Sequence, residues 1–90
     1  MVAITCNGRV LSAISHTETK AGLPKSEFVL ECASPNSLPM QFAVCSFGRM
    51  AEETAGFRIG DHLLVYGRMA CNSSGKDQRV VLLASLFEIL

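Results

Sequence analysis

The chain has 90 residues, of which 49% are hydrophobic and 18% charged, and its eight basic and eight acidic side chains give a net charge of zero. This length allows one small domain, residues 1–90, and the apolar fraction excludes a disordered chain. Without a basic excess, binding to nucleic acid would depend on where individual Lys and Arg side chains lie.

The first predicted element is a long strand from Val2 to Ile14. Asn7-Gly8 in its middle predicts a bulge or bend and not a hairpin, because the strands on either side would be too short. The stretch from Ser15 to Lys25 is polar and contains Gly and Pro, which predicts a connecting loop.

The second and third strands are predicted from Ser26 to Ala33 and from Met40 to Phe47, separated by a loop with two prolines that ends at Pro39. Alternation places one set of second-strand side chains on the core face: Phe28, Leu30 and Cys32. In the third strand, Phe47 leads into the next element and is expected to be buried, which sets the orientation of the others. Ala43 and Cys45 are then predicted to point inward, and Met40, Phe42, Val44 and Ser46 outward.

Helix-forming residues from Arg49 to Ala55, stopped by Gly56, predict a helix of barely two turns. The fourth strand, from His62 to Met69, alternates between two partly apolar faces. One face carries Leu63, Val65, Gly67 and Met69, and the other carries Leu64, Tyr66 and Arg68. A hairpin loop from Cys71 to Gln78 and a nearly continuous apolar strand from Val80 to Leu90 complete the chain.

Four cysteines, Cys6, Cys32, Cys45 and Cys71, occur without Cys-x-x-Cys spacing, which argues against a zinc site and favours reduced, mostly buried thiols. The first residues lack the basic and apolar regions of a signal peptide, and no apolar run reaches the ~20 residues of a membrane span. We therefore expect a cytoplasmic protein that does not interact with membranes and holds no metal or cofactor.

Five strands with one short helix between the third and fourth is the element order of the all-β OB-fold, a small barrel whose second and third strands and flanking loops commonly bind oligonucleotides. The sequence therefore predicts a single OB-fold domain.

Three segments carry a resemblance to a known family. Gly-Arg-Met-Ala-Glu-Glu from Gly48, Gly60-Asp61, and Val-Tyr-Gly-Arg-Met from Val65 resemble the bacterial single-stranded-DNA-binding protein superfamily. Within it, residues 21–31 and 80–90 resemble more closely the primosomal replication protein N (PriB) family. The resemblance implies a homodimer that binds single-stranded DNA without sequence preference in primosome assembly and replication restart. It also implies two partners, the restart helicase PriA and the helicase-loading factor DnaT.

The chain departs from the family pattern in having no Trp and only Lys76 and Arg79 as cations near the last hairpin, where relatives are richer in lysine. Weak or site-limited DNA binding is therefore expected. Phe42 and Tyr66 are the aromatic side chains predicted to face outward, and the resemblance places Phe42 at the family's base-stacking position. A dimer or edge contact stays the alternative for Phe42, and base contact stays open for Tyr66. The other phenylalanines, Phe28, Phe47, Phe57 and Phe87, are predicted to lie in the core.

Phosphate binding needs flexible cations beside the stacking face. The predicted set is Lys20, Lys25, Arg68, Lys76 and Arg79. Arg9, Arg49 and Arg58 are excluded because their turn and helix positions place them elsewhere.

Two other functions are alternatives to DNA binding. An enzyme is not expected, because no Gly-x-Ser-x-Gly, His-Glu-x-x-His, paired carboxylates or phosphate-binding glycine loop occurs. An OB-fold that binds other replication proteins with little or no nucleic acid stays open, since the charge is neutral and outward aromatics are few. Val2, Ile4, Val10 and Leu11 give the first strand an apolar edge, which predicts dimerisation through it.

Overall fold

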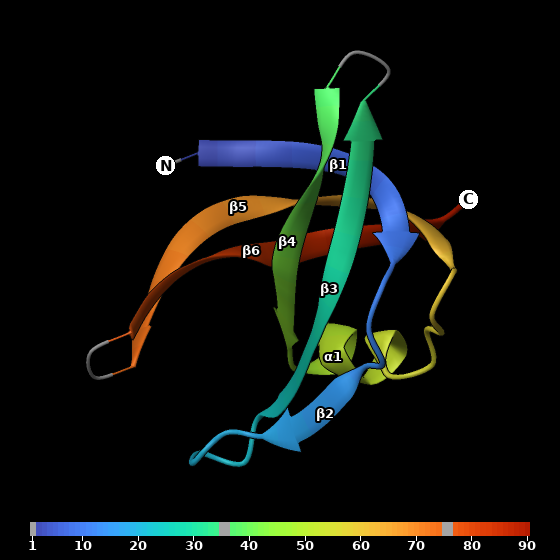
Figure 1. Cartoon of the computed structure of the whole chain (residues 1–90). Helices are drawn as coiled ribbons and strands as arrows, with labels where there is room; N and C mark the ends of the chain where they lie inside the picture. The colour runs from blue at the N-terminus through green and yellow to red at the C-terminus, as the bar shows by residue number, and fades with distance from the viewer. Residues whose placement is uncertain (1, 35–36, 75–76) are drawn as a thin grey trace.

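The computed structural model describes residues 2–34, 37–74 and 77–90 (Figure 1). Its elements, in chain order, are β1 (Val2–Val10), β2 (Ser15–Glu18), β3 (Pro24–Ser34), β4 (Ser37–Phe47), α1 (Arg49–Thr54), β5 (His62–Ser74) and β6 (Asp77–Ile89). The helix lies between β4 and β5, at the end of the molecule away from the tip of the β3–β4 hairpin.

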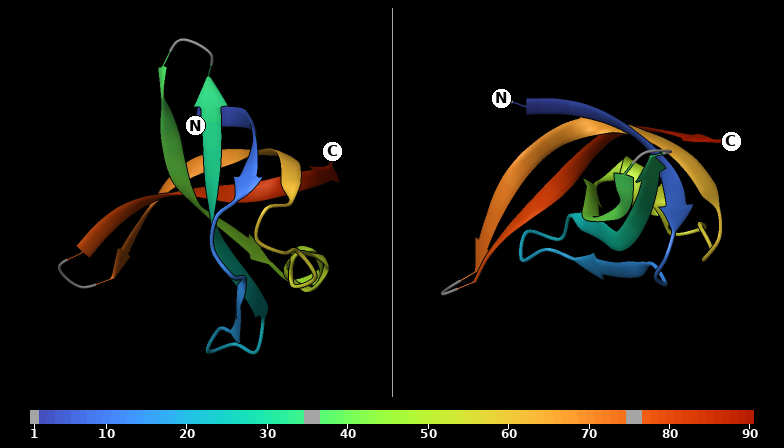
Figure 2. Two further views of the ribbon diagram at one scale, coloured as in Figure 1. Left: turned by 45° about the vertical axis from the view of Figure 1, so that its right-hand side comes forward. Right: turned by 45° about the horizontal axis from the view of Figure 1, so that its top comes forward.

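Five of the strands close into a barrel. The sheet runs β1-β5-β6-β4-β3, and a further pairing of β1 with β3 joins its two ends, while β2 extends the sheet beyond β3. All these pairings are antiparallel except β4 with β6, which is parallel. Figure 2 shows β5 and β6 as one long curved hairpin that extends well beyond the barrel wall. The predicted OB-fold, with its short helix between the third and fourth barrel strands, is confirmed.

Branched aliphatic side chains fill the barrel. The fully buried members are Leu30, Val44, Leu63, Val65 and Leu82. At one side of this core three rings pack together, with Phe57 edge-on to Phe28 and to Phe87 at centroid distances of 6.3 and 5.4 Å. The predicted core faces of β3 and β5 and the core positions of these three phenylalanines are therefore confirmed.

Buried hydroxyl groups fix the helix to the barrel. Ser26 Oγ donates a hydrogen bond to the Ala51 carbonyl at 2.7 Å, so its contact with His16 Nδ1 at 2.9 Å has the ring nitrogen as donor. Thr54 Oγ1 donates to the Met50 carbonyl at 2.7 Å and accepts from Ser46 Oγ at 3.2 Å. A helix of six residues is too short to be stable alone, and these contacts hold it in place.

Strand boundaries differ from the prediction at several places. β1 ends at Val10, because its amide and carbonyl are bonded by Asp61 and Gly60 of the turn before β5. The predicted loop after it contains β2, whose four exposed residues pair with β3 although their polar side chains gave no strand signal.

The last hairpin is an extended arm and not a loop beginning at Cys71. Backbone pairing of β5 with β6 continues as far as Ser74 opposite Asp77. The predicted loop before the third barrel strand ends at Pro39, whereas β4 already begins at Ser37 and includes this proline. There β4 pairs with β3 alone, since β6 pairs only with residues 43–45, so the missing amide hydrogen of Pro39 faces an unpaired edge.

The predicted orientation of the third barrel strand is wrong. Val44 is fully buried, Phe42 packs against the core, and Phe47 is 41% exposed. The buried place beside the helix is occupied by Ser46, which bonds to Thr54, so the aromatic ring next in sequence turns outward. Cys45 is buried as well, so both faces of β4 are covered at this point and alternation is not visible in the sequence.

The expectation of four unpaired thiols is also wrong. Cys6 and Cys32 form a disulfide between β1 and β3, whereas Cys45 is a buried thiol and Cys71 an exposed one. Among the described residues, no helix is long and apolar enough to cross a membrane.

Candidate nucleic-acid interface

The outer face of the β3-β4-β6-β5 sheet brings together cations and an exposed aromatic ring. Lys25 of β3 lies directly opposite Phe47 of β4. Two residues before Phe47 on the same face of β4, Cys45 lies opposite Leu83 of β6, and Leu83 lies opposite Arg68 of β5. Lys25 and Arg68 therefore flank Phe47 on a continuous sheet face.

Phe47 separates two adjoining hollows of this surface. One has a volume of about 520 Å³ and is lined by Phe47, Met50, Arg68, Leu83, Ala84 and Ser85. The other, of about 260 Å³, is lined by Lys25, Cys45, Phe47, Ala70, Cys71, Val81 and Leu83. We call the two together the Phe47 groove. An exposed ring that lines both hollows can stack bases, and the cations Lys25 and Arg68, one in each hollow, can hold their phosphates.

The backbone fixes Phe47 on both sides. Its pairing with Lys25 ends β4, and Gly48 then turns with φ 65° while its amide donates to the Pro24 carbonyl at 2.9 Å. A positive φ favours glycine, so the strand-to-helix turn depends on this residue. The ring is thus held on rigid elements, as a preorganised contact requires.

A close approach of two strands positions Arg68. A Cβ on Gly67 would collide with the Leu83 carbonyl, so glycine allows β5 to pass near β6 beside the bulge at Tyr66 and Gly67. Arg68 is exposed and has no ion-pair partner among the described residues. Lys25 pairs weakly with Glu27, at 3.9 Å on a half-exposed surface. Both cations are therefore available to an anionic ligand.

The remaining sequence-predicted residues are distributed differently. Tyr66 is 47% exposed and lies opposite the exposed Leu86, next to the end of the groove that Arg68 and Ser85 line. Lys20 is exposed on the turn between β2 and β3 and lines neither hollow. Phe42 points to the core side of β4, away from the groove.

Two further DNA contacts are predicted between Cys71 and Val80 in the sequence. Lys76 falls outside the described residues, and the backbone of Arg79 pairs with Asn72 while its side chain lies outside the described part. Their role in DNA binding stays a prediction.

Phe47 is a surface residue that the sequence pattern did not reveal. Large aromatic side chains beside a helix are commonly buried, and the predicted orientation of the strand depended on a buried Phe47. In the structure Val44 is fully buried, and Phe47, three residues further along the strand, lies on the opposite, outer face.

Among the residues whose side chains the structure describes, no group of three or more could hold a metal ion. The residues that line the Phe47 groove offer stacking by Phe47 and positive charge from Lys25 and Arg68.

Comparison with known proteins finds structural likeness only. No protein-family model and no curated protein sequence matches the chain. The SSB domain of a Synechococcus protein is similar over 97% of this chain and 93% of its own, with a TM-score of 0.81 and 19% sequence identity. A small single-stranded DNA-binding protein from Streptomyces coelicolor covers 98% of this chain and 91% of its own, with a TM-score of 0.85 and 16% identity.

The single-stranded DNA-binding protein from Thermus aquaticus matches the whole of this chain with a TM-score of 0.86 and 19% identity, over 40% of its own length. Likeness at such low identity establishes the shared barrel and its connectivity. The OB-fold assignment thus has independent support from three solved structures.

Proposed function

We propose that this chain binds single-stranded DNA, without sequence preference, along the Phe47 groove. The observation that carries the proposal is the exposed ring of Phe47 between Lys25 and Arg68, on a fold shared with proteins described as single-stranded-DNA-binding. Stacking is indifferent to base identity because every base has an aromatic face. The net charge of the chain is zero and only two cations flank the ring, so we expect DNA binding to be weak and to depend on salt.

Titration of a fluorescent oligothymidine at two salt concentrations tests this function. The parent should bind at low salt and lose affinity as salt rises. Lys25→Ala with Arg68→Ala should weaken binding to all sequences alike and reduce the salt slope by about 1.4, since each phosphate contact on a single strand contributes about 0.7.

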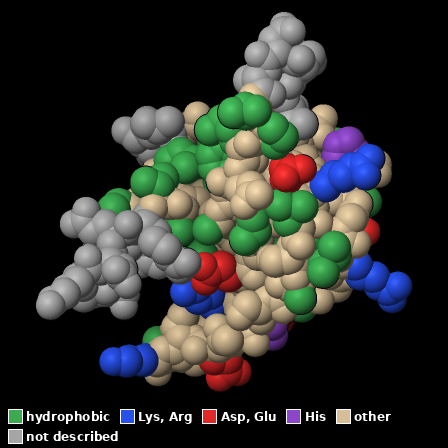
Figure 3. Space-filling view, viewed as in Figure 1, with side chains coloured by type: hydrophobic (Ala, Val, Ile, Leu, Met, Phe, Trp, Pro, Cys, Tyr) green, Lys and Arg blue, Asp and Glu red, His purple; other side chains and the backbone are tan. Residues whose placement is uncertain are grey.

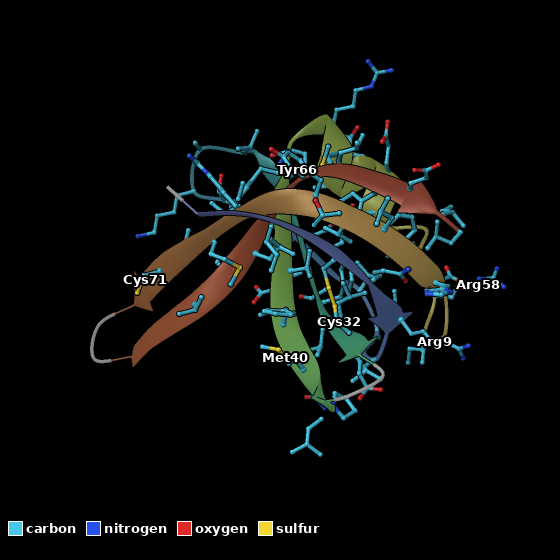
Figure 4. The ribbon with its side chains drawn as sticks, turned by 90° about the horizontal axis from the view of Figure 1, so that it is seen from above. Arg9, Cys32, Met40, Arg58, Tyr66 and Cys71 are labelled. Atoms are coloured by element: carbon cyan, nitrogen blue, oxygen red, sulfur yellow. A yellow bond between two sulfur atoms is a disulfide. The ribbon has the colours of Figure 1, made fainter. Side chains whose placement is uncertain are left out.

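The matched control is Arg9→Ala with Arg58→Ala, which removes the same charge. Both residues lie at the side of the barrel opposite Cys71 in Figure 4, away from the Phe47 groove. This variant should keep the salt slope of the parent. A parent that shows no binding at low salt would refute the proposed function.

The narrower role is that of a cytoplasmic, dimeric adaptor in primosome assembly and replication restart, with PriA and DnaT as partners. Its support is the sequence resemblance to the PriB family over residues 21–31 and 80–90. Pull-down of purified PriA and DnaT by the immobilised chain, with and without oligonucleotide, tests the partners directly. If neither PriA nor DnaT binds, the adaptor role is excluded and the proposed function is single-stranded DNA binding alone.

A protein-interaction module is the second candidate, and exposed apolar side chains favour it. Leu38, Met40 and Val80 are 86%, 58% and 63% exposed on β4 and β6. Figure 3 shows hydrophobic side chains gathered between the tip of the β3–β4 hairpin and the tip of the β5–β6 arm. Met40→Ser with Val80→Ser should abolish partner capture without altering oligonucleotide affinity if this surface binds proteins.

A further inference from the structure

The junction between β1 and β3 is the narrowest part of the barrel wall. β1 pairs with β5 over eight residue pairs from Val2 to Arg9, but with β3 only through Arg9 and Val10. One more bond, from the Leu11 amide to the Val29 carbonyl at 2.8 Å, extends this junction on one side. On the other side the strands diverge, and there the Cys6 and Cys32 sulfurs are bonded (Figure 4).

Gly8 brings these cysteines together. A Cβ at this position would collide with the Glu31 carbonyl and lie 3.1 Å from the Cys32 sulfur, so only glycine lets β1 cross β3 this closely. Cys6 and Cys32 both face the barrel interior, with their Cα atoms 6.6 Å apart, within the range that disulfides span. The pair is thus positioned by the strands themselves.

We propose that the Cys6–Cys32 bond is a reversible redox clasp that closes the β1–β3 junction. Cys32 is half-buried and Cys6 only 6% exposed, so an oxidant from solvent reaches the Cys32 thiol first. With hydrogen peroxide, the Cys32 thiolate attacks one peroxide oxygen and becomes a sulfenic acid. The O–O bond breaks to release hydroxide, which takes up the proton that the Cys32 thiol lost and becomes water. The Cys6 thiol then displaces hydroxide from that sulfur, forming the S–S bond and a second water molecule.

Reduction follows the reverse order through the accessible sulfur. A dithiol reductant attacks Cys32, Cys6 leaves as a thiolate and takes up a proton, and the second thiol of the reductant releases Cys32. The clasp closes a segment of 26 residues, which limits the conformations of the unfolded chain. The oxidised form is therefore more stable than the reduced form, while the Phe47 groove, on β3–β6, is unchanged.

The test uses a Cys71→Ser background, because Cys71 is the exposed thiol that peroxide would also oxidise. Alkylation under denaturing conditions after peroxide treatment should modify only Cys45, and peptide mapping should link Cys6 to Cys32. After dithiothreitol all three remaining cysteines should be alkylated. The Tm should fall on reduction by on the order of 10 °C, and the Leu11 amide should exchange faster.

Cys32→Ser in the same background is the comparison variant, and it keeps the buried Cys6 in place. Its Tm should not respond to dithiothreitol. The proposal is overturned if all three cysteines are alkylated after peroxide or if a disulfide involves Cys45. It is also overturned if dithiothreitol lowers the Tm of Cys32→Ser as much as that of the background. The result is independent of DNA binding, since a chain that fails the oligonucleotide titration can still form or lack this bond.

Discussion

Phe47 and Phe42 are five residues apart on β4 and have opposite surroundings, because alternate side chains of a strand point to opposite faces. Phe47→Ala should reduce oligonucleotide affinity by about 1–3 kcal/mol for each base that loses its stacking, with the salt slope and Tm almost unchanged. Phe42→Ala should instead lower the free energy of unfolding, by up to about 3 kcal/mol, because its ring packs against the core.

Fluorescence titration and thermal melting of both variants separate these roles. If Phe42→Ala loses DNA affinity while its Tm stays that of the parent, the base contact predicted from the family resemblance lies on the core side of β4 after all. The Phe47 groove would then not be the stacking site.

Gly8 lets β1 approach β3 closely because it has no side chain. Gly8→Ala puts a methyl group against the Glu31 carbonyl, so β1 must move away from β3 at the barrel junction. We expect a destabilisation of about 1–3 kcal/mol by urea denaturation, as for other overpacked positions. Gly56→Ala is the matched control, since its new Cβ would meet only ordinary contacts at 3.8 Å. Equal stability of the two variants would contradict the close approach.

At the scale of elements, the number, order and type of the barrel strands could be predicted from alternation and turn residues. The orientation of β4 could not, because Val44, Cys45 and Ser46 are all buried and the two faces of the strand look alike in sequence. β2 was missed because its exposed polar residues are held only by pairing with β3. Tertiary pairing here overrides local propensity, as is common for strands.

The β5–β6 arm is the element for which DNA contacts were predicted from the sequence. Lys76→Ala with Arg79→Ala should lower the salt slope of oligonucleotide binding by about 1.4 and weaken all sequences alike. The fold should be unaffected, because the arm extends beyond the barrel wall (Figure 2). Titrations at two or more salt concentrations measure the slope, with Arg9→Ala/Arg58→Ala as the equal-charge control. A salt slope equal to that of the parent would show that Lys76 and Arg79 do not contact the DNA phosphates.

At the scale of the whole molecule, barrel closure leaves part of β1 unpaired. From Val2 to Gly8 the edge of β1 that faces away from β5 has no partner strand among the described residues. Val10, which the sequence assigned to an apolar dimer edge, is 1% exposed in the core and cannot contribute. The available edge is therefore the N-terminal part of β1, which includes the half-buried Ile4.

An exposed strand edge readily pairs with another chain, and the same edge of a second copy satisfies it with twofold symmetry. Light scattering at micromolar concentration should therefore give twice the chain mass of 9.7 kDa. Ala3 and Thr5 are exposed on this part of β1, so Ala3→Lys with Thr5→Lys places like charges face to face across the symmetric junction and should yield monomers. Lysines at the equally exposed Ser15 and Thr17 of β2 are the control and should leave the dimer intact. A parent that elutes as a monomer would show that β1 is protected in another way, and it would remove the dimeric adaptor while leaving the Phe47 groove of a single chain to bind DNA.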